Sequence, residues 1–166
     1  MVIHKWTVTS AIVLVAGFVF YFFIYDSPEK QIQKQFAVLA EKLEKQTGES
    51  PLISAGKAKA AADFFSHTCT VDIPEYDTQK KITAKEMARH ILAFKSRFVA
   101  VQVKFYDLSV ELTGENTALV AITAETRTTS ASGEAEENII EFECLLEKIE
   151  DNWKFYHISA VEVLEK

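Results

Sequence analysis

The sequence predicts an α+β domain carried behind one transmembrane helix, and three observations lead to this class. Residues 6–25 carry no charged side chain and are long and apolar enough to span a bilayer core. Apolar residues recur at helical spacing over residues 28–45, 55–65 and 83–94. From residue 98 onward the pattern is that of strands. Helices followed by a run of strands are typical of the α+β class.

Length and composition set the first limits on function. The 166 residues are enough for one domain, and the net charge of −6 argues against a nucleic-acid partner. The two cysteines, Cys69 and Cys144, have neither the spacing of a metal site nor the number needed for a disulfide framework. The sequence contains no phosphate loop, nucleophile elbow or zinc motif, so we expect no metal and no cofactor.

The N-terminal segment divides the chain into an anchor, residues 1–26, and a domain, residues 27–166. The apolar run is long for a cleaved signal peptide, and no small-x-small pattern follows it. We therefore expect a single-pass anchor through residues 6–25 in the inner (cell) membrane. The short tail with Lys5 favours an inside N-terminus and a periplasmic or otherwise extracytoplasmic domain, although the lysines after the anchor favour the opposite orientation.

The first half of the domain carries clear helix signals. Ser27 is placed to cap a helix with Pro28 at its first position, and this helix is expected to run to about Lys45. An alanine-rich helix is predicted over 55–65, and short strands over 68–74 and near Ile82. Thr83 and Glu86 form a capping box that opens a third helix.

The second half predicts four long strands. The apolar parity changes within residues 99–112, and a β-bulge at Tyr106–Asp107 reconciles the two phases and bends the strand. The next strand covers 118–128, and residues 138–164 form a closing hairpin. Its turn is predicted at Asp151–Asn152, which pairs Leu146 with His157. The resulting core face holds Ile140, Phe142, Cys144, Leu146, Phe155, His157, Ser159, Val161 and Val163.

This order of elements, with a last hairpin that turns through Asp151, Trp153 and Lys154, resembles the nuclear transport factor 2-like superfamily from about residue 28 to 164. The family includes ketosteroid isomerase, scytalone dehydratase and the SnoaL-like cyclases, and its turn usually contains a glycine that this chain lacks. The resemblance implies three helices in the concave face of a curved, mostly antiparallel sheet, a cystatin-like cone whose mouth holds any ligand. It also implies a homodimer through the outer sheet face, which would carry Ile139, Leu145, Tyr156 and Ile158.

The closing hairpin supplies the candidate site. Phe142, Cys144, Phe155, His157 and Ser159 are expected to line a ligand pocket. His157 is a candidate general base if an acidic residue lies beside it, and the candidate partners are Asp72 and Asp107. The alternative for His157 is a neutral, hydrogen-bonded core histidine. Arg89 and Arg127 suit an anionic ligand or, more simply, an exposed surface.

Two functional hypotheses follow from these residues. The first is a non-enzymatic module that binds a small apolar ligand or a partner protein, since no local motif matches a known catalytic one. The second is an isomerase, dehydratase or cyclase that uses His157 with an acid in the cone. The fold by itself does not choose between them.

Overall fold

The structure is a computed structural model that describes residues 27–73 and 78–161. The predicted anchor at 6–25 lies outside these residues, and no helix within them is long and apolar enough to cross a membrane. The elements are α2 (Pro28–Leu43), α3 (Pro51–Ala62), β1 (Phe65–Ile73), β2 (Thr78–Thr83), α4 (Ala84–Ser96), β3 (Ala100–Gly114), β4 (Thr117–Thr129), β5 (Ala135–Ile149) and β6 (Asn152–Val161).

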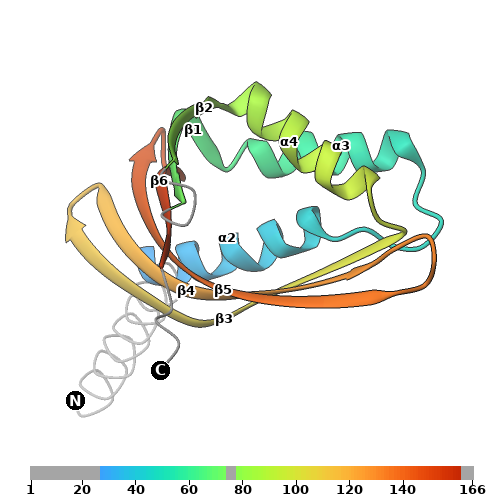
Figure 1. Cartoon of the computed structure of the whole chain (residues 1–166). Helices are drawn as coiled ribbons and strands as arrows, with labels where there is room; N and C mark the ends of the chain where they lie inside the picture. The colour runs from blue at the N-terminus through green and yellow to red at the C-terminus, as the bar shows by residue number, and fades with distance from the viewer. Residues whose placement is uncertain (1–26, 74–77, 162–166) are drawn as a thin grey trace, which may run out of the picture.

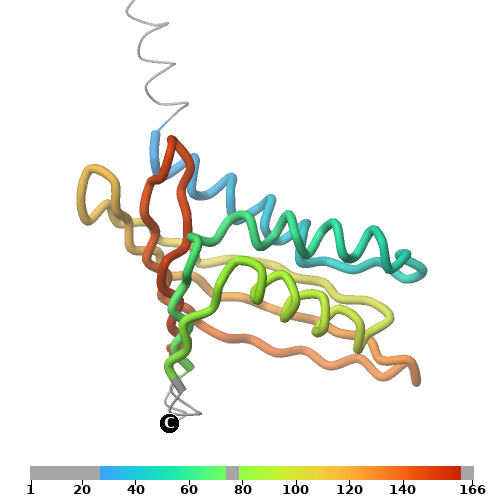
Figure 2. Tube along the Cα trace, turned by 90° about the horizontal axis from the view of Figure 1, so that it is seen from above, coloured from blue at the N-terminus to red at the C-terminus, as the bar shows by residue number. Residues whose placement is uncertain are grey.

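Six strands form one curved sheet in the order β2-β1-β6-β5-β4-β3. Every neighbouring pair is antiparallel except β1 and β6, which run parallel. Figure 1 shows the long strands β3, β4 and β5 as a floor and β6, β1 and β2 as a wall that rises from it. The three helices lie side by side within this curve (Figure 2), so the predicted fold class is confirmed for the described domain.

Each helix begins where a side chain satisfies its first free amide groups. The Ser27 hydroxyl accepts from the Lys30 amide at 3.4 Å, and Pro28 follows at the first helical position. Thr83 and Glu86 form the predicted capping box of α4. The second helix begins at Pro51 rather than at residue 55, because Ser50 and Pro51 repeat the signal given by Ser27 and Pro28.

A bulge bends β3 over the helices, as predicted. The pairing of β3 with β4 shifts register between Tyr106 and Ser109, and Asp107 has a φ of 53°. An extra residue on one strand increases the local twist and bends the strand. The bend gives the floor of the sheet its concave side, where α2 packs.

The closing hairpin turns one residue earlier than predicted. Glu150 and Asp151 have φ angles of 47° and 63°, the left-handed pair that a two-residue type I′ turn requires. The turn pairs Ile149 with Asn152 and Leu146 with Phe155. The predicted pairing of Leu146 with His157 is therefore wrong, because the true partner of Leu146 lies two residues earlier on β6.

A second bulge, at Tyr156, reverses the faces of β6. On its far side Leu145 pairs with His157 and Cys144 pairs with Ile158. Ile158 consequently faces the helices, while His157 lies on the outer face of the sheet. The predictions that placed His157, Ser159 and Val161 on the core face are wrong, and so is the placement of Ile158 on the outer face. Val163 lies outside the described residues.

Candidate functional site

A cavity of about 370 Å³ lies between α2, α4 and the concave face of the sheet. Its size falls in the range of small-molecule sites. Six phenylalanines contribute to its wall: Phe36, Phe65, Phe94, Phe105, Phe142 and Phe155. Leucine, isoleucine, valine and alanine side chains supply most of the remainder, so the cavity is apolar and strongly aromatic.

The aromatic wall is organised around Phe36 of α2. Its ring meets Phe105 and Phe155 edge to face, at centroid distances of 5.4 and 5.2 Å. Phe65 packs against Phe155 at 5.3 Å. Edge-to-face pairs stabilise each other beyond the burial of their area. These contacts fix the rings of α2, β1, β3 and β6 in one preformed surface.

The cavity opens between α4 and β5. His90 is exposed, and Phe94, one turn later on α4, is 40% exposed. Across from them Ile140 is 36% exposed and pairs with Ala124, whose side chain lines the cavity. In the described part of the chain, β5 pairs with β6 from Glu141 to Ile149. An apolar rim therefore surrounds the mouth.

Cys144 is the thiol in the cavity wall, and its chemistry is that of a small apolar residue. Burial raises the pKa of Cys144 to about 12 and that of Cys69 to about 11. A thiol with so high a pKa holds its proton at neutral pH and is a poor nucleophile. Both cysteines are free and buried, on strands β1 and β5, which β6 separates.

Lys95 is buried at the end of the cavity where α2 and α4 terminate. Its side chain is 1% exposed and lines the cavity, and its ammonium group donates to the backbone carbonyls of Lys42 at 3.1 Å and Glu44 at 2.9 Å. The Glu49 carboxylate lies 3.7 Å away. The Lys95 ammonium group therefore caps the C-terminus of α2, whose last carbonyls have no partner within the helix.

A second lysine makes the reciprocal contact. Lys45, just after α2, donates from its ammonium group to the carbonyls of Lys95 at 3.0 Å and Phe98 at 2.6 Å, at the end of α4. Lys57 binds Glu49 at 2.6 Å. We call the group formed by Lys45, Glu49, Lys57 and Lys95 the lysine junction. It ties the ends of the two helices together beside the cavity.

The structure brings together only part of the predicted site. Phe142, Cys144 and Phe155 line the cavity, whereas His157 and Ser159 lie on the outer face. Asp72 of β1 is in register with Ser159 of β6 and lies on the same outer face. Asp107 is exposed at the bulge of β3.

The proposed catalytic pair therefore does not meet in the cavity. Within the described residues, no three His, Cys, Asp or Glu side chains gather as they do around a metal ion. Arg127 pairs with Glu137 and Arg89 with Glu86, and both arginines are exposed.

Comparison with known proteins identifies the fold. No family profile and no curated protein matches the sequence. A candidate dehydratase of the nuclear transport factor 2-like family from Streptomyces avermitilis superposes with a TM-score of 0.63 at 16% identity, over 82% of this chain and 97% of that chain. A candidate scytalone dehydratase from Novosphingobium aromaticivorans gives a TM-score of 0.65 at 11% identity, over 81% of this chain and 83% of that chain.

The described domain has the nuclear transport factor 2-like fold. A nuclear transport factor 2-like protein of unknown function from Shewanella oneidensis also superposes, with a TM-score of 0.56 at 13% identity, over 82% of this chain and all of that chain. At these identities the likeness concerns the fold alone. The fold that the resemblance implied is thus confirmed for the domain, and its chemistry follows from the residues of its own cavity.

Sequence reasoning missed His90 and Lys95, the two basic residues of the cavity wall. Both lie on α4, and each is one turn from an apolar cavity residue: His90 from Phe94, and Lys95 from Ile91. The spacing of i and i+4 places each pair on one side of the helix. The position of Lys95 on the apolar stripe of an amphipathic helix was the sequence signal that could have placed it in the cavity wall.

Glu49 gives the lysine junction a pH dependence. Burial alone would raise the pKa of Glu49, but hydrogen bonds from Lys57 and Ser54 and the charge of Lys95 lower it to about 2. The unfolded value is near 4.5, so the carboxylate stabilises the fold above that pH, and the contribution is lost as the pH falls toward 2. We expect about 2 kcal/mol of this stabilisation to disappear between pH 7 and pH 3.

Glu49→Gln tests this assignment. The variant should be less stable at pH 7, and its free energy of unfolding should fall by about 2 kcal/mol less than that of the unmodified chain between pH 7 and pH 3. Denaturant unfolding at the two pH values measures both quantities. Glu111→Gln, at an exposed position on β3, is the control and should keep the full pH dependence. An unchanged pH dependence in Glu49→Gln would refute the assignment.

Proposed function

We propose that this domain is a non-enzymatic module that binds a small apolar ligand in its cavity. One observation carries the proposal, namely a preformed cavity of about 370 Å³ whose wall is built mainly from phenylalanine and aliphatic side chains. Sites for small molecules are concave, mostly apolar and largely formed in advance. The edge-to-face contacts of Phe36 hold its aromatic wall in place before any ligand arrives.

The polar groups of the wall support binding over catalysis. A general base and a proton donor must converge on one substrate. The Cys144 thiol keeps its proton, because burial raises its pKa to about 12, and the ammonium group of Lys95 is engaged by the end of α2. His90 is exposed at the mouth, and the nearby carboxylate of Glu86 is engaged by the capping box. The isomerase, dehydratase or cyclase alternative depended on His157, which lies outside the cavity.

The cavity wall also favours a flat ligand. Aromatic rings present both faces and edges, and an aromatic ligand can pair with them in the offset or edge-to-face geometry that the wall itself uses. Burying roughly 200 Å² of ligand surface contributes about 5 kcal/mol at ~25 cal/mol per Å². That value corresponds to an affinity in the range of hundreds of micromolar before any polar contact is added.

Filling the cavity should abolish binding. In Ala124→Phe the new ring occupies the cavity, because Ala124 is buried in its wall on β4. We expect the neutral ligand naphthylmethanol to raise the melting temperature of the unmodified full-length chain, held in uncharged detergent micelles, and to leave that of Ala124→Phe unchanged. The melt is followed with a thiol-reactive maleimide dye. The chain has two cysteines, and both are buried in the domain until it unfolds.

The matched control for this experiment is Ala121→Phe. Ala121 lies on the same strand, is exposed on the outer face and pairs with Glu143. This variant adds the same ring outside the cavity and should keep the full response to naphthylmethanol. The proposal fails if naphthylmethanol does not raise the melting temperature of the unmodified chain, or if both alanine variants respond equally.

We further propose that residues 6–25 anchor the domain in the cell membrane and that the domain lies outside the cytoplasm. The proposal is supported by the uncharged apolar segment and by Lys5 on its N-terminal side. Paired reporter fusions after Lys166 give the measurement. An alkaline phosphatase fusion should be active and a green fluorescent protein fusion dark. The reverse pattern would place the domain in the cytoplasm and leave the cavity argument unaffected.

A further inference from the structure

We propose that the ligand of this cavity carries one anionic group, such as the carboxylate of an aromatic or aliphatic acid, and that this group faces Lys95. The inference rests on the proposed function and adds the chemical class of the ligand. It is carried by the position of a buried cation in the wall of an apolar cavity.

The ammonium group of Lys95 retains a donor for such a ligand. A lysine has three N–H donors, and two of them are used by the carbonyls of Lys42 and Glu44. The nearest carboxylate oxygen belongs to Glu49 and lies 3.7 Å away, which is longer than a hydrogen bond. An anionic oxygen in the cavity would accept a hydrogen bond from the third N–H donor of Lys95.

The charges of the lysine junction favour an anion over a cation. Two ammonium groups, from Lys57 and Lys95, lie beside the single carboxylate of Glu49, and the positive charge of Lys45 lies close to Lys95. The carbonyl dipoles at the ends of α2 and α4 offset part of this positive charge. The remaining positive charge acts beside an apolar cavity, where weak solvent screening strengthens its attraction for an anion. A cationic ligand would be repelled at this end, and a neutral one would leave the donor unused.

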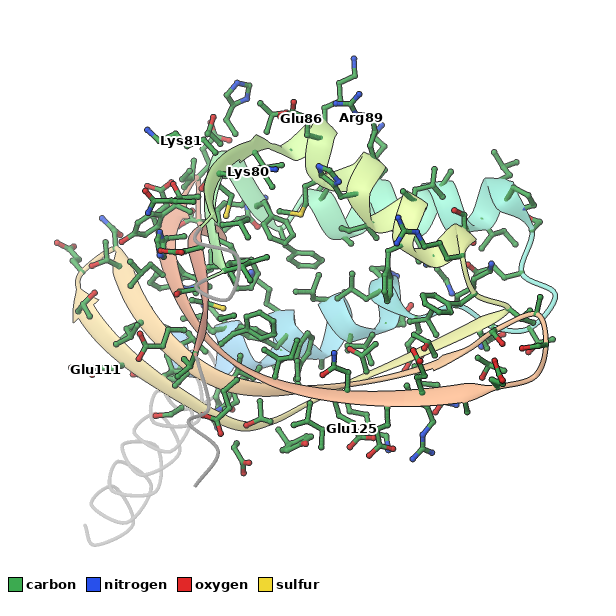
Figure 3. The ribbon with its side chains drawn as sticks, in the orientation of Figure 1. Lys80, Lys81, Glu86, Arg89, Glu111 and Glu125 are labelled. Atoms are coloured by element: carbon green, nitrogen blue, oxygen red, sulfur yellow. The ribbon has the colours of Figure 1, made fainter. Side chains whose placement is uncertain are left out.

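The outer surface near the mouth also carries positive charge. Besides the buried Lys95, residues 78–97, which include β2 and α4, contain five lysine or arginine residues and one glutamate, in a chain whose net charge is −6. Figure 3 shows Lys80, Lys81 and Arg89 on this side of the molecule, and Glu111 and Glu125 on the opposite, convex side of the sheet. Such segregated charge steers anions toward the side that carries the mouth.

Two ligands that differ only in charge test the inference. Naphthoate and naphthylmethanol share one ring system, and one carries a carboxylate where the other carries a hydroxymethyl group. With the full-length chain and the maleimide melt described above, we expect naphthoate to bind about tenfold tighter, since a hydrogen bond to a charged group adds about 1.4 kcal/mol or more. Raising the salt concentration to about 0.5 M should reduce this advantage and leave the response to naphthylmethanol in place.

Variants of the junction locate the contact. Glu49→Gln keeps Lys95 and should keep the preference for naphthoate. The double variant Glu49→Gln with Lys95→Met removes both charges and keeps the aliphatic stem of the lysine. It should bind the two ligands equally. Lys104→Met, at an exposed position on β3, is the control and should behave as the unmodified chain.

The possible outcomes separate the two proposals. If neither ligand raises the melting temperature of the unmodified chain, the binding function itself fails. If both raise it equally, or if naphthoate keeps its advantage in the double variant, the anion inference is overturned while apolar binding stands. Should the double variant not fold, Glu49→Gln decides, because it leaves the charge of Lys95 without its neighbouring carboxylate. A naphthoate advantage that falls in Glu49→Gln contradicts the inference.

Discussion

The exchange of contacts between two lysines at the ends of α2 and α4 is the constraint on which this architecture depends. Lys95 caps the end of α2, and Lys45 caps the end of α4. The backbone of Lys45 also pairs with Val101 of β3, through hydrogen bonds of 2.8 and 2.9 Å. The C-terminal ends of α2 and α4 and the first residues of β3 therefore meet at one point, and this point borders the cavity.

A charge buried in this way is a poor source of stability. Desolvation of two buried ions can exceed their mutual attraction, and apolar replacements of similar volume are often equally stable. Burial lowers the pKa of Lys95, and the charge of Glu49 offsets part of this effect. The fold also leaves apolar rings facing open space in the cavity, where they lack packing partners. Both features cost stability in the empty protein, and both become favourable contacts when an apolar acid fills the cavity.

The local pattern of the sequence predicted the parts of the fold that local physics decides. The caps at Ser27 and Thr83 and the bulge at Tyr106–Asp107 are short-range features that can be read within a few residues. The second bulge, at Tyr156, leaves the same kind of signal, since the apolar parity of Trp153 and Phe155 changes at Ile158. Treating β6 as regular placed His157 on the wrong face, and placing the turn one residue late shifted its predicted pairing partner.

The candidate site was predictable only where it lies on that hairpin. Phe142 and Cys144 line the cavity because the alternation of β5 is regular, and Phe155 lines it because it precedes the bulge of β6. Lys95 was not expected, because its role depends on α2 ending beside α4. That contact joins residues about fifty positions apart, and no short-range pattern encodes it.

The central claim is that an apolar ligand occupies the space between Phe36 and the sheet. The most direct measurement is of intermolecular nuclear Overhauser effects between naphthylmethanol and a full-length chain labelled at phenylalanine. The account predicts contacts from the ligand to the rings of Phe36, Phe105 and Phe155. Contacts confined to the phenylalanines of residues 18–23, or to none, would contradict it.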